Sequence, residues 1–206
     1  MTQTTATASL SSPVIRPPTR FLLEQTRLLP RGKALDVAAG TGRNTLFLAE
    51  AGFAVHAVDR DRDALKTLSS VARERGLSTI TVEELDLESP ENPILPALLF
   101  PAAAYDVVVV FFYLFRPLFP ALLHTLKPGG TLLYETFLAE NYLRYQRPRH
   151  REFCLEPGEL PDLAQGLEIL HYDESERPGK DGGPVTFTAR LLARKPESAK
   201  GDHGKK

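Results

Sequence analysis

The chain has 206 residues, of which 42% are hydrophobic and 25% charged, proportions that fit one globular domain and exclude global disorder. Its formal net charge of −1 gives no support to non-specific nucleic-acid binding. The single cysteine, Cys154, excludes an internal disulfide, and no Cys/His array offers a metal site. A reducing, cytoplasmic location is therefore the default expectation.

The two ends of the chain differ in composition from its middle. Residues 1–15 are rich in Thr, Ser and Pro and have no apolar core, which predicts a disordered tail and not a secretory signal. The composition of residues 195–206, KPESAKGDHGKK, predicts a second disordered tail. We therefore expect one domain, over residues 16–194.

The first half of this domain alternates helical and strand patterns. Glycines and a proline mark where the elements stop, with Pro30 and Gly32 after the first helix and Gly76 after the third. The predicted elements are a helix over 19–29, a strand over 34–38, a helix over 45–50, a strand over 54–58, a helix over 61–75 and a strand over 79–85.

An almost wholly apolar stretch, residues 94–115, predicts a central strand and not a membrane span. Two prolines would break a helix there, and Asp106 would lie in hydrocarbon. Residues 107–112 are β-branched or aromatic, which favours a strand. A strand that is apolar on both faces belongs inside a parallel sheet covered by helices. We place this strand at 106–112 and expect no membrane partner.

The second half of the domain ends in two adjacent strand patterns. Strand–helix alternation followed by such a pair predicts an α/β fold whose sheet is mostly parallel, with an antiparallel C-terminal strand. The predicted elements are a helix over 118–126, a turn over 127–130, a strand over 131–137 and strands over 167–172 and 185–193, joined by a loop with the sequence PGKDGG.

A glycine turn follows the first predicted strand and precedes a helix. Gly40 and Gly42 let the backbone approach a ligand at the carboxyl ends of the strands. Thr45 stands where a dinucleotide-binding fingerprint needs Gly or Ala, so that fingerprint is incomplete. No Lys-Ser/Thr pair follows the glycines, which excludes a nucleoside-triphosphate loop. Asp59 ends the next strand, 19 residues after Gly40, where a carboxylate can accept both hydroxyls of a ribose. Asp86 follows the third strand and could hold an adenine amino group, although it could equally be an ordinary turn residue.

The segments DVAAGTGRN, VDRD, LDLE and KPGGTLLYETF together resemble the class I S-adenosylmethionine-dependent methyltransferases. Within that superfamily, TRFLLE and GKALDVAAGTGRNTLFLAEAGFAVHAVDRD are most similar to the TehB-like (tellurite-resistance) small-molecule methyltransferases, whose loop often has the sequence D-[LV]-G-C-G-x-G-R-N. The chain departs from that pattern at Ala38 and Ala39, where the family usually has Gly and Cys. The resemblance covers residues 16–194. It implies a three-layer Rossmann-like sheet of about seven strands and S-adenosyl-L-methionine as the cofactor.

The resemblance also implies cofactor-binding roles at matching positions. Gly40 and Gly42 would lie close to the methionine part and the ribose of the cofactor. Asp59 would accept from the ribose hydroxyls, and Asp86 would accept from the adenine amino group. Either Phe111 or Phe112 would border the sulfonium, and an arginine before the first helix would lie near the methionine carboxylate. The implied set is Arg20, Ala38, Gly40, Gly42, Arg43, Asn44, Asp59, Arg60, Asp86, Leu87 and Phe111.

Methyl transfer from a sulfonium is an in-line displacement, so the protein contributes mostly proximity and orientation. A general base is needed only if the acceptor must lose a proton, and no histidine is well placed for that role, so we assign no catalytic residue. Residues 141–151, NYLRYQRPRHR, follow the fifth strand and could cover an anionic acceptor, or could be a solvated loop. The substrate candidates are Tyr113, Arg144 and Arg147.

The chain lacks the sequence signatures of two nucleic-acid chemistries. No Asn/Asp-Pro-Pro-Tyr/Phe segment follows the fourth strand, and no Pro-Cys nucleophile is present, so a small-molecule acceptor is favoured. The alternatives are a non-catalytic cofactor-binding or interaction module of the same fold, and an RNA or protein methyltransferase guided by the arginines of residues 144–151. A hydride-transfer enzyme is a more distant alternative, and the oligomeric state is left open.

Overall fold

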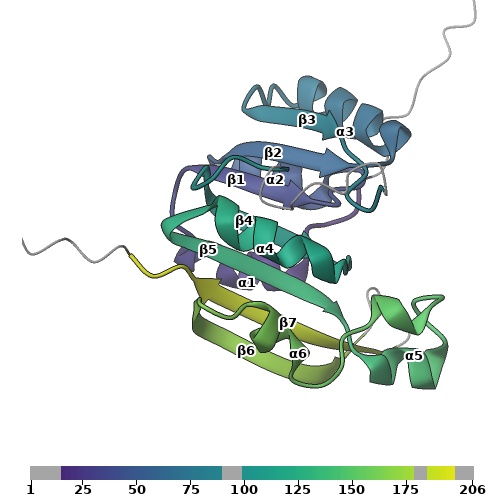
Figure 1. Ribbon diagram of the computed structural model, residues 1–206. Helices are drawn as coiled ribbons and strands as arrows, with labels where there is room; N and C mark the ends of the chain where they lie inside the picture. Colours follow the sequence, from purple (N-terminus) through teal and green to yellow (C-terminus); the bar gives the residue numbers. More distant parts are fainter. Residues whose placement is uncertain (1–14, 90–98, 179–184, 198–206) are drawn as a thin grey trace, which may run out of the picture.

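The computed structural model describes residues 15–89, 99–178 and 185–197. Strands and helices alternate along most of this part of the chain (Figure 1). The elements are α1 (Arg20–Gln25), η1 (Thr26–Leu28), β1 (Lys33–Val37), α2 (Arg43–Glu50), β2 (Ala54–Asp59), α3 (Arg62–Glu74), β3 (Ile80–Glu84), β4 (Tyr105–Phe111), η3 (Arg116–Leu118), α4 (Phe119–Thr125), β5 (Leu126–Phe137), α5 (Ala139–Tyr145), η4 (Arg151–Phe153), α6 (Glu159–Leu163), β6 (Glu168–Arg177) and β7 (Thr186–Arg194).

The strands of this part of the chain form one seven-stranded sheet in the order β3-β2-β1-β4-β5-β7-β6. Strands β1 to β5 pair in parallel, and β7 is antiparallel to both of its neighbours, β5 and β6. The predicted fold class is thereby confirmed. From β1 the chain moves outward to β2 and β3 and then returns to β4 on the other side of β1. Ligands bind at such a switch point in open α/β sheets, beyond the carboxyl ends of the strands.

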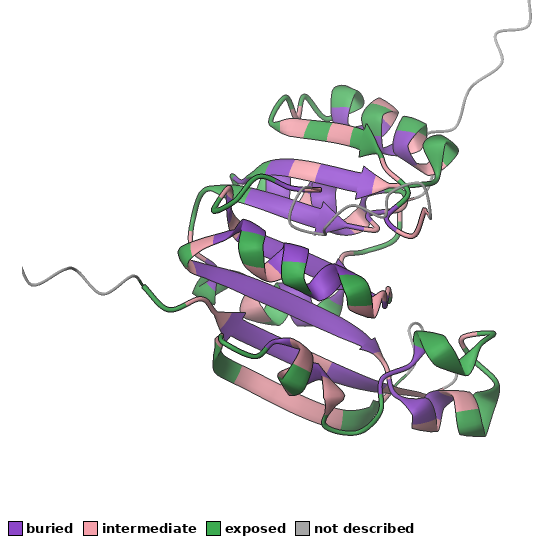
Figure 2. Cartoon of the chain, viewed as in Figure 1, coloured by how far each residue is buried: buried purple, intermediate pink, exposed green. Residues whose placement is uncertain are grey.

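The alternation of side chains along β4 shows how the layers are held together. Val107 and Val109 pack with residues of α1 and α2, whereas Val108 and Val110 pack with residues of α4 and α6. All four valines have no exposed surface, because helices cover both faces of the sheet (Figure 2). The continuous apolar run in the sequence is therefore the buried centre of three layers.

Local signals set the bounds of the helices. Asp61 precedes α3, and its Oδ1 atom accepts from the backbone N–H groups of Asp63 and Ala64, both at 3.0 Å. This is an N-cap, and it fixes where α3 begins. Gly76 ends the helix in the left-handed region, with φ of 67°.

The structure differs from the sequence prediction in the region of the predicted turn and in the segment that follows β5. The predicted turn over 127–130 belongs to β5, because the backbone of Gly129 and Gly130 pairs with that of Lys195. Two helices, α5 and α6, lie after β5, where no helix was predicted. The PGKDGG loop and most of both predicted tails lie outside the described residues. In the part of the chain that is described, no helix combines the length and apolarity needed to cross a bilayer.

Candidate functional site

The backbone adopts a rarely populated conformation on both sides of the switch point. Ala38 follows β1 directly and Phe112 follows β4 directly, and their φ angles are 55° and 59°. The left-handed region costs a residue with a Cβ atom roughly 1–2 kcal/mol. Two such residues on neighbouring strands identify this edge of the sheet as a candidate functional site.

The two glycines of the loop between β1 and α2 have different surroundings. A Cβ atom on Gly42 would lie 2.2 Å from the Leu68 side chain, so this glycine lets α3 pack against the loop. A Cβ atom on Gly40 would meet no other atom within 4 Å. Gly40 therefore presents open backbone surface to whatever lies above the sheet, which is the role that the sequence predicts for a cofactor-facing glycine.

The carboxylate of Asp59 is tied to the backbone on both sides. Its Oδ2 atom accepts from the N–H group of Gly40 at 2.7 Å, and its Oδ1 atom accepts from that of Asp61 at 2.8 Å. These two hydrogen bonds fix the rotamer of Asp59 and join the glycine loop to the end of β2. Each carboxylate oxygen has a further lone pair, so Asp59 can still accept from a ligand.

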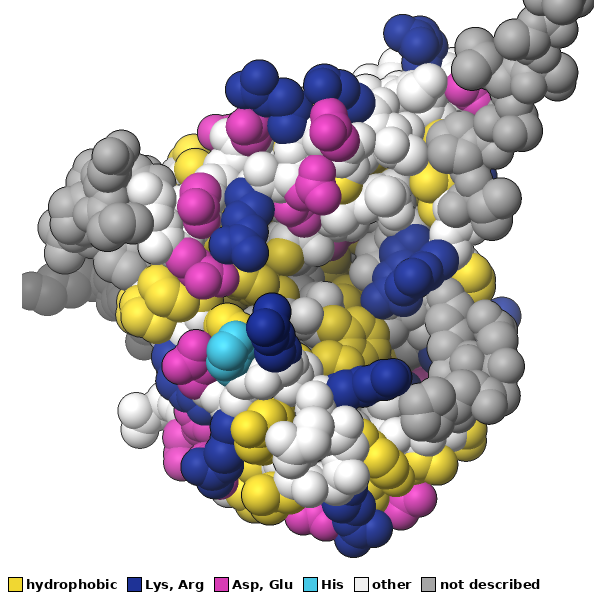
Figure 3. Space-filling model, turned by 90° about the vertical axis from the view of Figure 1, so that its right-hand side faces the viewer, with side chains coloured by type: hydrophobic (Ala, Val, Ile, Leu, Met, Phe, Trp, Pro, Cys, Tyr) yellow, Lys and Arg dark blue, Asp and Glu magenta, His cyan; other side chains and the backbone are white. Residues whose placement is uncertain are grey.

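A cavity of about 260 Å³ opens beyond the carboxyl ends of the strands. Figure 3 shows this edge of the molecule, with hydrophobic side chains in a central hollow and acidic side chains gathered toward the ends of β2 and β3. The walls come from the ends of β1 to β5 and from the segment that follows α5. The lining residues are Ala38, Asp59, Arg60, Leu85, Asp86, Leu87, Glu88, Phe112, Tyr113, Leu114, Phe137, Pro148 and Phe153.

The cavity has a polar end and an aromatic end. Among its described lining residues, Asp59, Asp86 and Glu88 carry negative charge and Arg60 carries positive charge. The aromatic end includes Tyr113, whose hydroxyl is buried beside the Glu88 carboxylate. Burial, together with the nearby Glu88 carboxylate, raises the pKa of Tyr113. A neutral hydroxyl is thus available to a ligand in this cavity.

A buried carboxyl group lies under the glycine loop. Asp36, on β1, is 1% exposed and accepts a hydrogen bond from the Thr45 hydroxyl at 2.6 Å. Burial raises its pKa to about 7, and the Asp59 carboxylate contributes in the same direction, whereas Thr45 and Arg43 oppose the shift. The loop therefore rests on a carboxyl group that changes charge near neutral pH.

Asn44, a residue of the predicted set, connects the N-terminal segment to the loop. Asn44, which is 5% exposed, accepts from the backbone N–H group of Thr19 at 2.9 Å. The guanidinium of Arg43 lies over the ring of Phe112, 5.5 Å from its centre. Arg20 is exposed and pairs with Glu24 at 2.7 Å. These contacts place α1 and the start of α2 beside the same edge of the sheet.

The segment after β5 closes the cavity on its aromatic side. Arg116 anchors this segment: its guanidinium pairs with Glu159 and donates to the backbone carbonyls of Glu152 and Cys154. Pro148 and Phe153 of this segment line the cavity. A cover over the aromatic end of the cavity is therefore present, and the two residues by which it lines the cavity are apolar.

The structure brings six predicted residues to the cavity wall and directs three others elsewhere. The side chain of Phe111 packs in the core, and Phe112, the alternative, lines the cavity. Arg144 pairs with Glu140 and lies over Phe187, and Arg147 is exposed and absent from the lining. The six predicted residues in the wall are Ala38, Asp59, Arg60, Asp86, Leu87 and Tyr113.

Several residues that line the cavity were not predicted from the sequence. Leu85, Glu88, Leu114 and Phe137 lie near the ends of β3, β4 and β5, so position at a strand end was a signal that could have found them. Pro148 and Phe153 had no comparable signal, because only the fold of the covering segment turns them inward. Cys154 is buried, and burial raises the pKa of its thiol to about 11. No group of three or more metal-ligating side chains occurs among the described residues.

Comparison with known proteins shows the family to which the chain is similar. A family model named "Tellurite resistance protein TehB" matches residues 20–177. "Hemagglutinin 1" from Eikenella corrodens is 29% identical over 180 residues, which cover 80% of this chain and 55% of that protein. The chain thus spans about half the length of this curated relative.

Two solved structures share the fold. The crystal structure of TehB from Haemophilus influenzae superimposes with a TM-score of 0.69 and 20% identity, over 84% of this chain and 61% of that one. A SAM-dependent methyltransferase from Methanosarcina mazei gives a TM-score of 0.63 and 19% identity, over 85% of this chain and 98% of that one. At these identities the likeness is one of fold.

Proposed function

This chain belongs to the TehB family, and from that premise we propose that it transfers a methyl group from S-adenosyl-L-methionine to a small-molecule acceptor. Membership in the family implies S-adenosyl-L-methionine as the cofactor. The observation that carries the proposal is the pairing of Asp59 with Gly40. It places a fixed carboxylate beside open glycine backbone at the switch point of the sheet.

The residues present fit such a cofactor. Asp59 has free lone pairs for the ribose hydroxyls, and Asp86 and Leu87 border the polar end of the cavity, where an adenine ring would lie. Arg60 would flank that ring. The carbonyl of Ala38 would accept from the cofactor's ammonium group. Gly42, Asn44 and Arg43 would support the loop, and Arg20 would act on the methionine carboxylate from the start of α1.

The aromatic end of the cavity is where we place the methyl acceptor. When bound, the cofactor supplies an electrophilic methyl group on a positively charged sulfur. Phe112, Phe137 and Phe153 would enclose the acceptor and exclude water, and the hydroxyl of Tyr113 would orient it. Glu88 lies beside Tyr113 and would take up a proton from an acceptor that must lose one.

Arg144 and Arg147 stay predictions for substrate binding. Neither arginine lines the cavity, so each would contact only an acceptor that carries a negative charge and reaches the cavity rim. A cytoplasmic location also stays part of the proposal.

The test has a binding arm and a turnover arm. Isothermal titration with S-adenosylhomocysteine should show micromolar binding at one site, and a panel of small acceptors should yield that same product from S-adenosyl-L-methionine. Binding without turnover across the panel would favour a non-catalytic module. No binding of either compound by the folded protein would overturn the proposal.

A further inference from the structure

The aromatic end of the cavity presents a carboxylate as well as rings. Glu88 follows β3 and Tyr113 follows β4, and both line the cavity. The Tyr113 hydroxyl is buried beside the Glu88 carboxylate, which acts with burial to keep that hydroxyl neutral by raising its pKa. Glu88 itself is half-buried, so a ligand in the cavity can reach it. An acceptor at this end therefore meets a negative charge next to a neutral hydroxyl.

The rings of the aromatic end favour an acceptor with an apolar body. Phe112 and Phe137 are in contact, with ring centres 5.2 Å apart, and Phe153 reaches the cavity from the covering segment. Phe112 is 38% exposed and Phe153 is 37% exposed, so an apolar occupant would remove more of both rings from water. Arg43 lies over the Phe112 ring but is absent from the cavity lining.

The charges of the lining are unbalanced toward the negative. Its described residues supply three carboxylates, from Asp59, Asp86 and Glu88, and one guanidinium, from Arg60. The Tyr113 hydroxyl lies within reach of this field: Glu88 and Asp86 raise its pKa, whereas Arg60 opposes them. Ribose and adenine, the parts of the cofactor assigned to Asp59 and Asp86, are neutral. They leave the charge of Glu88 uncompensated.

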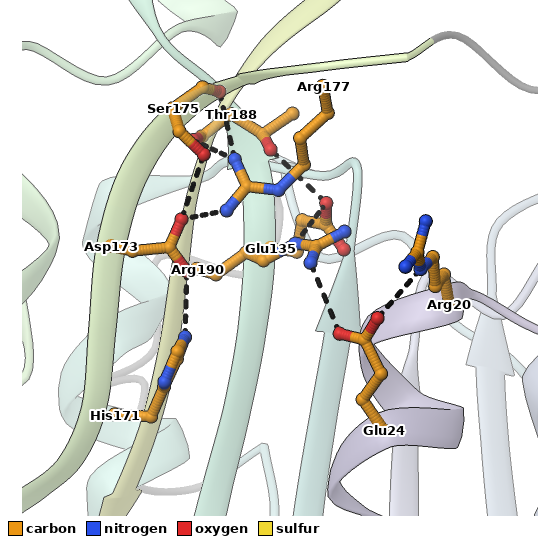
Figure 4. Close-up of polar contacts among 9 residues, drawn as sticks. All are labelled: Arg20, Glu24, Glu135, His171, Asp173, Ser175, Arg177, Thr188 and Arg190. Atoms are coloured by element: carbon orange, nitrogen blue, oxygen red, sulfur yellow. Dashed lines mark hydrogen bonds and ion pairs between the residues drawn. The ribbon is translucent and has the colours of Figure 1, made fainter.

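Arginines on the neighbouring elements are already engaged by carboxylates. This holds in the covering segment and in the row of ion pairs beside α1, which Figure 4 shows. Arg147 and Arg149 of the covering segment are exposed and absent from the lining. An anion at the aromatic end would have to draw a guanidinium from an existing pair or from solvent. The pairs are Arg144–Glu140, Arg151–Glu156, Arg20–Glu24, Arg177–Asp173, and Arg190 with both Glu135 and Glu24.

These observations identify a chemical class of acceptor. An anion would be repelled by Glu88 in surroundings that screen charge poorly, whereas an ammonium group would be attracted by Glu88 and by the faces of the rings. We propose that the acceptor group which enters the aromatic end is an amine on an apolar or aromatic body, and that Glu88 selects it over oxyanions. This inference rests on the proposed function, since it names the acceptor of the same site.

The same carboxylate accounts for the proton that an amine must lose. Glu88 takes a proton from the ammonium form of the acceptor, which frees the nitrogen lone pair. An apolar surrounding favours this transfer, because it lowers the pKa of an ammonium group and raises that of a carboxyl group. The lone pair then forms the bond to the methyl carbon, while the electron pair of the breaking carbon–sulfur bond stays on sulfur. The products are the N-methylated ammonium ion and S-adenosylhomocysteine, and Glu88 returns its proton to solvent.

The binding test uses three ligands of similar size and different charge: benzylamine, benzyl alcohol and benzoate. The full chain is first saturated with S-adenosylhomocysteine, whose own binding is measured by calorimetry. Ligand-observed NMR titrations then give the three affinities. We expect benzylamine to bind about 10- to 100-fold more tightly than benzoate, with benzyl alcohol between them, as a hydrogen bond to a charged group would give.

The variant E88Q tests whether Glu88 is the selecting group. Its amide carries no charge, so the preference for benzylamine over benzoate should fall at least tenfold, while affinity for S-adenosylhomocysteine stays unchanged. E50Q is the matched control, because it makes the same change at an exposed residue of α2 that pairs with Arg75 and does not line the cavity. It should keep the wild-type preference.

A turnover test compares a panel of primary arylalkylamines with tellurite and selenite, at equal concentrations with S-adenosyl-L-methionine. We expect S-adenosylhomocysteine to form with amines of the panel and not with the two oxyanions.

Three results would overturn the inference. The first is wild-type protein that binds benzoate as tightly as benzylamine or binds none of the three ligands, which does not depend on any variant folding. The second is turnover of an oxyanion without turnover of any amine. The third is E88Q protein that keeps the full preference for benzylamine. Failure of the wild type to bind S-adenosylhomocysteine would instead contradict the proposed function.

Discussion

Asp59 Oδ2 accepts a hydrogen bond from the backbone N–H group of Gly40 at 2.7 Å, although the two residues belong to different strand–loop units. The contact joins the glycine loop to the end of β2. The first prediction concerns this carboxylate. Asp59→Ala should weaken binding of S-adenosylhomocysteine roughly 10- to 150-fold, because the ribose loses hydrogen bonds to a charged acceptor. Calorimetric titration measures the change.

Asp59→Asn is the control for this substitution. Its amide oxygen can still accept from Gly40, but its amide nitrogen cannot accept from the N–H group of Asp61, so one of the two backbone contacts is kept and the loss of affinity should be smaller than for alanine. Unchanged affinity in the alanine variant would contradict the assignment of Asp59 to the ribose.

Alanine substitutions of the two loop glycines should affect different properties of the protein. Gly40→Ala adds a methyl group that meets nothing in the protein, so the cost to stability should stay near the roughly 1–2 kcal/mol of a left-handed alanine. Its affinity for S-adenosylhomocysteine should nevertheless fall by more than tenfold, because the methyl group occupies the surface on which the cofactor would lie.

Gly42→Ala should instead lower the melting temperature strongly, since the new Cβ atom would lie 2.2 Å from Leu68. Thermal unfolding and titration of both variants separate the two effects. If the Gly40 variant lost affinity only to the extent that it lost stability, the result would argue against an open, cofactor-facing backbone at Gly40.

Asp36 should make stability depend on pH. Burial raises its pKa from 3.8 to about 7, so between these values the native protein holds a proton that the unfolded chain releases. The free energy of unfolding should therefore fall as pH rises from about 4 to 7, by about 4 kcal/mol if this group acts alone.

Asp36→Asn should remove this fall while keeping an oxygen for the Thr45 hydroxyl. Urea unfolding of both proteins at several pH values measures it, and the difference in stability between variant and wild type should grow with pH. Parallel curves would show that Asp36 does not titrate in this range.

Tyr113→Phe should separate stability from activity. The hydroxyl is buried beside the Glu88 carboxylate, so its removal should change the free energy of unfolding by about 1 kcal/mol or less. If the hydroxyl orients the acceptor, kcat/KM for the acceptor should fall about two- to tenfold while affinity for S-adenosylhomocysteine stays the same. Steady-state kinetics with an acceptor found in the panel decide the question, and unchanged kcat/KM would remove Tyr113 from the acceptor site.

Local patterns predicted much of the fold because they carry most of its determinants. The run of valines in β4 is apolar at every position, which only a strand covered on both faces requires, and the structure places it at the centre of the sheet. The helix from Arg62 to Glu74 begins at the Asp61 cap and ends before Gly76, both visible in the sequence. By contrast, α5 and α6 have short, weakly periodic patterns, and their stability comes from packing on the rest of the domain.

The candidate site also contains residues that the sequence pattern could place and residues that it could not. Position after a strand was enough to bring Ala38, Asp59, Asp86 and Tyr113 to one edge, because the carboxyl ends of parallel strands meet there. It was not enough to choose between Phe111 and Phe112. Strand alternation turns Phe111 into the core, and the positive φ of Phe112 sends the next ring toward the cavity.

The sequence by itself determined the strand–helix alternation, the glycine loop and the carboxylate that follows the second strand, because each depends on residues close together in the chain. Only the tertiary structure decided that Tyr113 lies beside Glu88, which arginines are already paired, and that the two residues by which the cover lines the cavity are apolar. These properties depend on contacts between residues dozens of positions apart. Burial and pairing of a charged group are set by its neighbours in space, which no local pattern specifies.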